Sequence, residues 1–252
     1  MKSALTFGLL IAVAGLLVAG MLNSMPENVV MAAYATPLEG RLTTQRLNAE
    51  LALDKLDGVV IQPGEVFSFN DSVGTWSRND GYRKAPVSFN GQLIWTWGGG
   101  VCQTSTTLYN AMLLAGLELV ERHRHRFAPG YIVAGRDAAV AYSNIDLKFR
   151  NPYSWPVTIH AETANEKLLC TITGKRSPTS AISIVTQLDN VQSPSTLVDN
   201  PKGIGGRIMN PGKMGYSVAT YRVWSTDAGT RRELLSKDTY PAMNRVVRRG
   251  DG

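Results

Sequence analysis

Residues 97–110 of the chain read WGGGVCQTSTTLYN, so that three glycines run directly into a cysteine. Because glycine has no Cβ atom, this approach can adopt positive φ angles and pass close to other atoms. The residues that follow favour a helix, since their hydroxyl groups can cap a first turn and apolar residues recur at helical spacing until Gly116. We therefore predict a helix that begins at or next to Cys102.

Cys102 is the candidate nucleophile. Unpaired N–H groups and the macrodipole at a helix N-terminus favour a thiolate over a thiol and lower its pKa. Backbone N–H groups from Val101 to Gln103 would also be positioned to stabilise an oxyanion. The alternative interpretation is that Cys102 is a small buried apolar residue, as free cysteines often are.

The chain has a second cysteine, Cys170. Two cysteines are too few for a disulfide scaffold, and these two are badly spaced for zinc. Leu168, Cys170 and Ile172 alternate with more polar neighbours, a pattern typical of a strand with one face in the core. We interpret Cys170 as a core residue, with a single disulfide to Cys102 as the alternative.

Length and composition indicate a globular protein with a core. The chain has 252 residues, 44% of them hydrophobic, a net charge of +6 and an isoelectric point near 9.4. No nucleic-acid-binding motif accompanies this charge, so we expect no nucleic-acid partner. An anionic cell envelope would suit a mildly basic protein, and a solvated basic surface is the alternative.

The N-terminus carries an apolar run over residues 4–22, preceded by a lysine. Its length suits a membrane helix, and the lysine predicts a cytoplasmic N-terminus with the rest exported. We interpret residues 1–22 as a membrane anchor and 23–35 as a tether. The alternative is a signal peptide cleaved after Ala33-Tyr34-Ala35, which would give a secreted protein.

Residues 36–174 combine helical and strand patterns. Spacing predicts a helix over 42–56, and residues 74–91 read as a long loop with a short extended piece. Strands are predicted at 59–61, 66–69, 145–149, 157–161 and 168–173. The pattern indicates an α+β fold in which the cysteine-bearing helix, paired with a second helix, packs on a mostly antiparallel sheet.

The segment from Leu117 to Arg126 alternates with period two and predicts a strand. This alternation puts His123 and His125 on one face, where either histidine could act as a base. A metal site that also used His160 is a weaker alternative, because no carboxylate or cysteine stands at ligand spacing. We expect no metal and no other cofactor.

Residues 175–252 are rich in Ser, Pro, Thr and Asn, with short strands near 182–185, 216–224 and 232–235. They are predicted to form a small all-β module. The segment holds no enzyme motif, and binding or spacing is therefore its expected role.

The cysteine motif at 98–111 resembles the signature of the VanW domain family, named for an accessory protein of vancomycin-resistance operons. The resemblance extends over roughly 36–174 and is carried by the segments 52–60, 63–70, 121–125 and 135–138. Residues from 203 to 250 resemble, more weakly, the G5-like β module often found after VanW domains.

Some members of the family resemble a class of peptidoglycan L,D-transpeptidase that uses the cysteine of this motif. The resemblance implies wall cross-linking chemistry, with Cys102 as nucleophile and His125 at the position of the family's histidine. This sequence has Arg124 where the family commonly has Pro, and Arg126 where it commonly has Ser. Those two differences alter the charge around the base.

The mechanism expected from these observations is acyl transfer in two halves. The Cys102 thiolate would attack a stem-peptide carbonyl, release D-Ala and pass the acyl group from a thioester to the amine of a second stem. Asp137 is the first candidate to orient His125, and Asp146 is the second. The residues expected to bind substrate or an oxyanion are Gly99, Gly100, Val101, Gln103, Ser105 and Arg122.

Arg122 or Arg126 could bind a carboxylate of the stem peptide through two hydrogen bonds, and a solvated arginine face is the alternative that we favour. The expected partners are therefore peptidoglycan stem peptides, and the membrane through the N-terminal helix. The expected location is a bacterial cell envelope, with the domain outside the cytoplasm. The competing hypothesis is a non-catalytic protein that binds the wall or assists glycopeptide resistance, with a purely structural glycine–cysteine turn.

Overall fold

The computed structural model describes residues 28–89, 92–142 and 144–250. The predicted membrane helix of residues 4–22 lies outside these ranges. Within them, no helix combines the length and the hydropathy that crossing a membrane requires.

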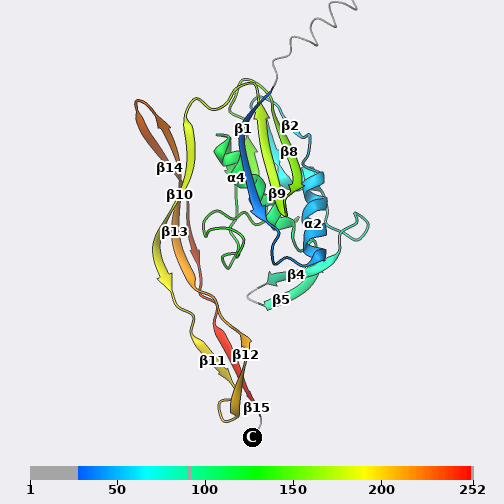
Figure 1. The fold of residues 1–252 in the computed structure, drawn as a ribbon, viewed down its shortest axis with the longest axis vertical. Helices are drawn as coiled ribbons and strands as arrows, with labels where there is room; N and C mark the ends of the chain where they lie inside the picture. The colour runs from blue at the N-terminus through cyan, green and yellow to red at the C-terminus, as the bar shows by residue number, and fades with distance from the viewer. Residues whose placement is uncertain (1–27, 90–91, 143, 251–252) are drawn as a thin grey trace, which may run out of the picture.

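A four-stranded antiparallel sheet forms one layer of the first domain (Figure 1). Its strands, in spatial order, are β1 (Val29–Pro37), β9 (Lys167–Gly174), β8 (Val157–Ala164) and β2 (Val60–Ile61). Alternate side chains of β9 point into the core, and Cys170 is among those fully buried. The tether predicted for residues 23–35 is wrong from Val29 onward, since these residues pair with β9.

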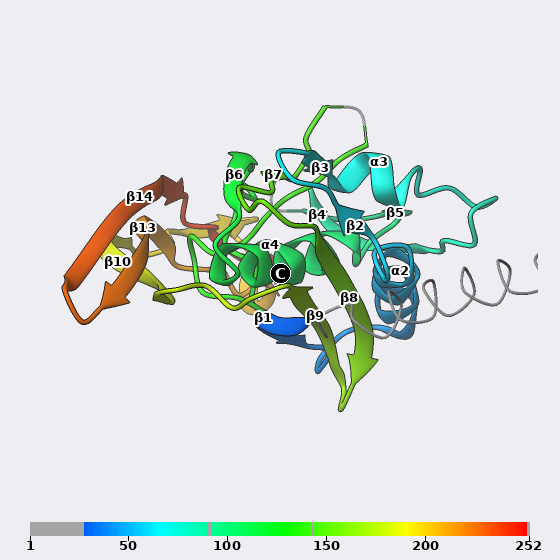
Figure 2. The same ribbon diagram turned by 90° about the horizontal axis from the view of Figure 1, so that it is seen from above.

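Two helices cover this sheet (Figure 2). The central helix α4 (Val101–Leu114) packs on β1, β9 and α2 (Thr43–Asp54), and nearly all of its side chains are buried. Its hydroxyl groups are satisfied inside the protein, because Thr107 is hydrogen-bonded to Thr36 at 2.7 Å and Thr104 donates to the carbonyl of Ala49 at 2.8 Å. The predicted helix pair on an antiparallel sheet is present.

Smaller elements surround the start of α4. A short helix α3 (Phe69–Val73) adjoins a sheet of β3 (Val66–Ser68), β7 (Lys148–Arg150) and β6 (Glu118–Glu121). The expected loop 74–91 instead contributes β4 (Lys84–Phe89), which pairs with β5 (Gln92–Trp97). The expected strand from Leu117 to Arg126 ends early, and a single bridge between His123 and Ala139 follows it.

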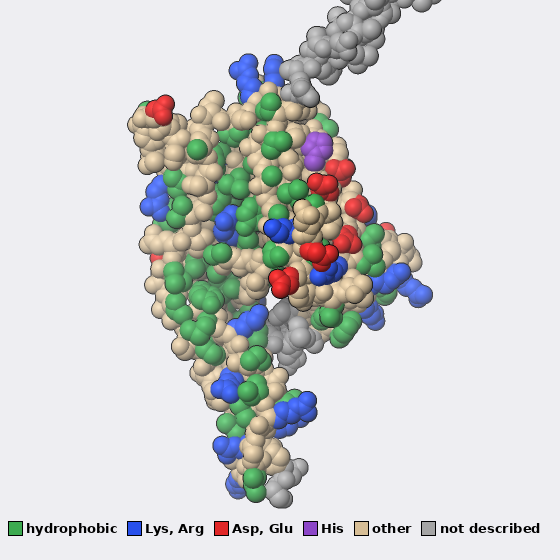
Figure 3. Space-filling model, viewed as in Figure 1, with side chains coloured by type: hydrophobic (Ala, Val, Ile, Leu, Met, Phe, Trp, Pro, Cys, Tyr) green, Lys and Arg blue, Asp and Glu red, His purple; other side chains and the backbone are tan. Residues whose placement is uncertain are grey.

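The C-terminal module, residues 181–250, is an elongated pair of three-stranded sheets beside the first domain (Figure 1). The sheet that adjoins the first domain contains β10 (Ala181–Gln192), β13 (Gly215–Thr226) and β14 (Gly229–Tyr240). The distal sheet contains β11 (Thr196–Asp199), β15 (Arg245–Gly250) and β12 (Ile204–Asn210). Figure 3 shows Lys and Arg side chains along this distal end.

The module is docked on the far end of α4 and on the segment that follows it. The buried guanidinium of Arg222 donates to the carbonyl of Leu117 at 2.5 Å and pairs with Glu233 at 2.8 Å. Ile184 and Leu235 pack against the core of the first domain. Buried polar and apolar contacts together therefore join the two parts of the chain.

Candidate active site

The glycine turn before α4 is shaped by close packing. A Cβ atom on Gly100, whose φ is +121°, would lie 2.2 Å from the carbonyl oxygen of Gln45 in α2, and one on Gly99 would lie 3.0 Å from Ala85 in β4. Glycine is needed because the neighbouring backbone leaves no room for a side chain. Gly100 borders the cleft described below, whereas Gly99 packs against β4 and is not among the residues that line the cleft.

Two of the predicted oxyanion donors are hydrogen-bonded to carbonyl groups of the turn itself. The N–H of Val101 donates to Gly98 at 3.0 Å, and the N–H of Gln103 donates to Gly100 at 2.9 Å. Cys102 is the second residue of α4, so its N–H precedes the first intrahelical bond. Within the described ranges this N–H donates to no carbonyl outside the helix. The oxyanion prediction is therefore wrong for Val101 and Gln103, and Cys102 itself keeps an available donor.

Cys102, His125 and Asp137 form a hydrogen-bonded chain. The thiol of Cys102 donates to the carbonyl of Val140 at 3.4 Å and is also hydrogen-bonded to the imidazole of His125. His125 Nδ1 lies 2.6 Å from Asp137 Oδ2, which also accepts the backbone N–H of His125 at 2.7 Å. Asp137 therefore fixes both the ring and the backbone of the histidine, which leaves Nε2 for the sulfur.

The charges of the three groups stabilise one another. Burial raises the pKa of the Cys102 thiol, but the hydrogen bond with His125 and its positive charge outweigh burial and lower this pKa. Burial lowers the pKa of His125, but hydrogen bonds with Asp137 and Cys102 raise it to about 10. Burial raises the pKa of Asp137, but the hydrogen bond and charge of His125, with Arg122, lower it to about 2. The arrangement therefore stabilises the charged forms of all three groups, the thiolate, the imidazolium and the carboxylate.

The second carboxylate oxygen of Asp137, Oδ1, is hydrogen-bonded to residues other than His125. Asp137 Oδ1 accepts hydrogen bonds from Arg122 Nη2 at 3.0 Å and from the Tyr240 hydroxyl at 2.5 Å. Arg122 Nη1 in turn donates to Asp238 at 2.6 Å. The Arg122 side chain is 5% exposed and is shared between two carboxylates. The prediction that Arg122 binds substrate is wrong, since the C-terminal module covers this side chain.

The competing histidine and aspartate lie elsewhere. His123 is 44% exposed and contacts Glu121 at 3.0 Å. The strand β6 ends at Glu121, so it does not place His123 and His125 on one face as predicted. Asp146 accepts hydrogen bonds from Ser68, from the backbone N–H of Asn70 in α3 and from that of Leu147, which is a structural role. His125 and Asp137 are therefore the pair that adjoins the cysteine.

The metal and disulfide alternatives find no support in the described ranges. His160 contacts Thr173 and Asp57 at the sheet, away from His123 and His125, and no described group of three or more ligand residues could hold a metal ion. Both cysteines are free thiols, and burial raises the pKa of Cys170.

Two further predicted binding residues have internal roles. The hydroxyl of Ser105 is fully buried and donates to the carbonyl of Ala138 at 2.7 Å, which ties α4 to the segment that carries Asp137. Its predicted contact with substrate is therefore wrong. Gln103 borders the cleft, but its amide donates to Pro37 at 2.8 Å and to Thr36 at 3.2 Å.

A cleft of about 330 Å³ opens over Cys102 and His125. Its charged lining residues are Arg41, Arg126 and Lys213, and no described Asp or Glu lines it. Arg41 stacks over Tyr131 at 4.6 Å, and the Tyr131 hydroxyl donates to the carbonyl of Cys102 at 3.2 Å. Arg41, Tyr131 and Lys213 come from three separate segments without a shared motif, so no pattern in the sequence marks them as site residues.

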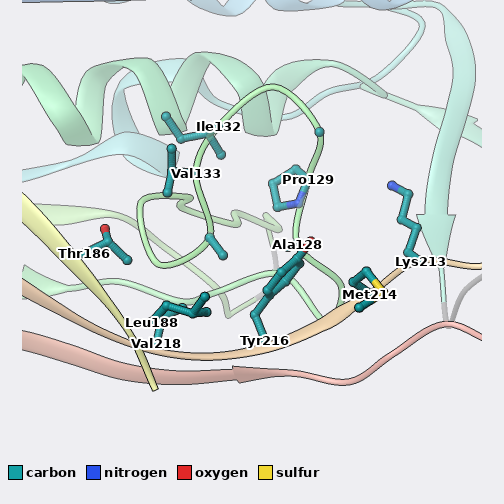
Figure 4. A pocket seen from close by; sticks show the side chains of 12 residues that line it. Ala128, Pro129, Ile132, Val133, Thr186, Leu188, Lys213, Met214, Tyr216 and Val218 are labelled. Atoms are coloured by element: carbon teal, nitrogen blue, oxygen red, sulfur yellow. The ribbon is translucent and has the colours of Figure 1, made fainter. Parts of the chain in front are cut away.

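A second cavity of about 500 Å³ lies beside the cleft and has a mostly apolar lining (Figure 4). Its walls come from residues 128–134 and from β10 and β13 of the module. Ala128, Pro129, Gly130 and Lys213 line both spaces. The module therefore forms part of the surroundings of the cleft.

The arrangement contains the groups that nucleophilic acyl transfer requires. In such a reaction Cys102 could supply a thiolate, His125 could carry a proton, Asp137 could orient the imidazole, and the Cys102 N–H could donate to an oxyanion. The cationic cleft would attract a substrate with carboxylate groups.

Comparison with solved structures gives similarities to G5 domains over 29% of this chain. The structure titled "IgA1 Protease G5 domain structure" is 20% identical, with a TM-score of 0.20 and 94% of that chain covered. The structure titled "Crystal structure of HP0197-G5" is 22% identical, with a TM-score of 0.19 and 96% of that chain covered.

Two curated relatives match about half of this chain. Uncharacterized protein YoaR of Bacillus subtilis (strain 168) is 37% identical over 139 residues, which are 55% of this chain and 46% of that protein. Vancomycin B-type resistance protein VanW of Enterococcus faecalis (strain ATCC 700802 / V583) is 30% identical over 136 residues, which are 52% of this chain and 50% of that protein. The chain thus spans about half the length of these relatives.

The family model described as "VanW like protein" matches residues 44–173. This range includes the glycine turn, α4, the Cys102–His125–Asp137 chain and most of the four-stranded sheet. It covers just over half of the protein. The chain therefore belongs to the VanW family.

Proposed function

We propose that the protein is a cysteine acyltransferase of the cell wall, an L,D-transpeptidase that joins peptidoglycan stem peptides through 3-3 cross-links. The observation that carries this proposal is the Cys102–His125–Asp137 chain at the base of an open cleft. A cysteine with a lowered pKa, next to an oriented histidine, is suited to form a thioester with a peptide carbonyl.

The first half of the reaction acylates the enzyme. The Cys102 sulfur attacks the carbonyl carbon between the third stem residue and D-Ala, forming a C–S bond. The oxygen takes up negative charge in the tetrahedral intermediate, and the Cys102 N–H stabilises it. As the C–N bond breaks, the His125 imidazolium gives its proton to the departing amine of D-Ala.

The second half transfers the acyl group. The side-chain amine of a second stem peptide attacks the thioester, and the neutral His125 accepts the proton that this amine loses. The C–S bond breaks and returns the thiolate beside the imidazolium. The products are one D-Ala and one amide bond between two stems, so atoms and protons balance without a further reactant.

The charge of the cleft supports a substrate of this class. A stem peptide that ends in D-Ala carries a terminal carboxylate, and three cationic side chains line the cleft, those of Arg41, Arg126 and Lys213. Guanidinium and ammonium groups bind carboxylates through strong charge-assisted hydrogen bonds. This role replaces the one predicted for Arg122, while Arg126 remains a candidate as predicted.

The cellular setting is also part of the proposal. One relative is a vancomycin B-type resistance protein, and the apolar run at residues 4–22 is suited to export. We infer an envelope location, anchored through that run or released if it is cleaved, with stem peptides and the membrane as partners.

The test is to incubate the protein with purified wall fragments that carry tetrapeptide stems and to analyse the products by mass spectrometry. We expect 3-3 cross-linked dimers and released D-Ala, which disappear with Cys102→Ala and persist with the matched control Cys170→Ala. Dimers that persist with Cys102→Ala would exclude Cys102 as nucleophile. Fragment binding without any product would favour the competing hypothesis of a non-catalytic wall-binding protein.

A further inference from the structure

The hydroxyl of Tyr240, the last residue of β14, lies behind the base. Tyr240 is 1% exposed, and its hydroxyl donates to Asp137 Oδ1 while it accepts the backbone N–H of Gly135 at 3.0 Å. A single group of the C-terminal module thus holds both the carboxylate of Asp137 and the turn that precedes it. Asp137 Oδ2, on the other side, is bound to His125.

A second residue of the module holds the same turn. The Thr220 hydroxyl, in β13, is fully buried and donates to the carbonyl of Gly135 at 3.2 Å. The packing is close, since a Cβ atom on Gly135, whose φ is +88°, would lie 2.3 Å from Thr220 Oγ1. Both backbone polar groups of Gly135 are therefore bound by side chains of the module.

The charges around Asp137 come from both parts of the chain. His125 and Arg122 contact its carboxylate from the first domain, and Tyr240 contacts it from the module. Asp238 of the module holds the other end of the Arg122 guanidinium. The Asp137 side chain is fully buried, so these contacts replace water around it.

We propose that the C-terminal β module completes the active site, with Tyr240 and Thr220 as positioning residues that hold Asp137 in the orientation His125 requires. The module then has a part in the chemistry, in place of the binding or spacing role expected from its sequence. The network is short, since Tyr240 reaches the Cys102 sulfur through Asp137 and His125 alone.

This inference rests on the proposed function for its role in turnover, but the positioning of Asp137 can be measured without a wall substrate. If Asp137 is less well held, His125 is less well oriented, and the thiolate form of Cys102 loses stabilisation. The rate at which Cys102 reacts with iodoacetamide, followed against pH, reports this directly. Groups that face the thiol are His125, Tyr131 and the carbonyl of Val140.

The experiment uses the full chain with Cys170→Ala, so that one thiol remains, and compares Tyr240→Phe with Tyr82→Phe. Tyr82 is an equally buried tyrosine in the first domain, and its hydroxyl has no hydrogen-bond partner among the described residues. For Tyr240→Phe we expect the alkylation rate at neutral pH to fall by roughly threefold to tenfold, which corresponds to the loss of one hydrogen bond. The midpoint of the pH profile should move to higher pH, and Tyr82→Phe should leave it in place.

Thr220→Val provides a second variant that retains Tyr240, and its profile should move in the same direction by a smaller amount. An unchanged profile or a shift to lower pH with folded Tyr240→Phe would overturn the proposal. In the wall-fragment assay kcat should fall without a change in KM, because Tyr240 does not line the cleft. If the parent protein makes no dimers yet the alkylation profile shifts, the proposed function fails while the positioning role stands.

Discussion

The start of α4 and the middle of β9 each hold one cysteine of the chain, and the main difference between their surroundings is the partner of the thiol. Burial raises the pKa of the thiol at both places. At Cys102 an oriented imidazole reverses this effect, whereas Cys170 lies among apolar side chains and its pKa stays raised. The comparison teaches that the partner His125, rather than the degree of burial, lowers the pKa of one thiol and leaves that of the other raised.

The largest effect should come from His125→Asn, which removes this difference. Burial would then dominate the pKa of Cys102, as it does at Cys170, and the proton carrier would be lost. We expect turnover to fall by about 10²- to 10⁴-fold, the usual contribution of a general acid–base. Rates of dimer formation from wall fragments measure this. The control is His123→Asn, which changes an exposed histidine and should retain activity; equal losses in both variants would contradict the assignment.

A smaller effect, on stability, is expected from Asp137→Asn, which removes the charge that holds His125. Arg122 would then be left with Asp238 as its carboxylate partner, and we expect a loss of about 3 kcal/mol in the free energy of unfolding. Urea denaturation measures this change. Asp199→Asn breaks an exposed pair with Arg248 and should cost about 0–1 kcal/mol.

The same variant has a pH signature. Since the pKa of Asp137 is lowered to about 2, its contribution to stability is complete above the unfolded pKa of about 4 and is lost as the pH falls toward 2. His125 has a raised pKa of about 10, so its contribution is complete below about pH 6.5 and is lost as the pH rises through 10. An Asn variant as acid-sensitive as the parent would contradict this account of Asp137.

A further difference between the two cysteines is the cleft, which is tested by Lys213→Ala. Removing one of its cations should raise KM about tenfold with little change in kcat, because a charge-assisted hydrogen bond to a substrate carboxylate is lost. Initial rates at several concentrations of wall fragments give both constants. Lys202→Ala, an exposed residue of the module, should leave both constants unchanged. An unchanged KM with Lys213→Ala would exclude Lys213 from substrate binding.

The smallest effect should follow from Cys170→Ala, which changes the unreactive cysteine. Removing one buried sulfur should cost about 1–2 kcal/mol of stability through a small cavity, and Cys102 should alkylate at the parent rate. Thermal unfolding and alkylation kinetics measure the two quantities. Slower alkylation of Cys102 in this variant would show that the two sites are coupled.

Much of the site could be predicted because its signals are local in the sequence. Three glycines before a hydroxyl-rich turn predict the start of α4. The alternation of apolar and more polar residues around Cys170 predicts that this cysteine is buried. His125 and Asp137 were the first candidates for base and orienter, and they adjoin Cys102 in the structure. The glycine and alternation signals depend on neighbours within a few residues, which helix and strand periodicity can describe, whereas the choice of His125 over His123 comes from the family resemblance.

The remaining features depend on contacts between distant segments. Tyr240 lies 103 residues from Asp137 along the chain, and no periodicity relates them. Arg122 looked like a solvent-facing or substrate-binding arginine because the sequence does not reveal that the module covers it. The apolar run before residues 29–35 suggests a tether, but these residues form strand β1. This strand depends on pairing with β9, which is at least 130 residues away along the chain.

The most direct test of the central claim is to alkylate the native protein with iodoacetamide over a range of pH and to follow each cysteine by peptide mapping. We predict that Cys102 reacts at neutral pH at least about tenfold faster than Cys170, with a midpoint below the ordinary thiol value of about 8.5. Equally slow reaction at both cysteines, or a native disulfide between them, would contradict the claim that His125 makes Cys102 a nucleophile.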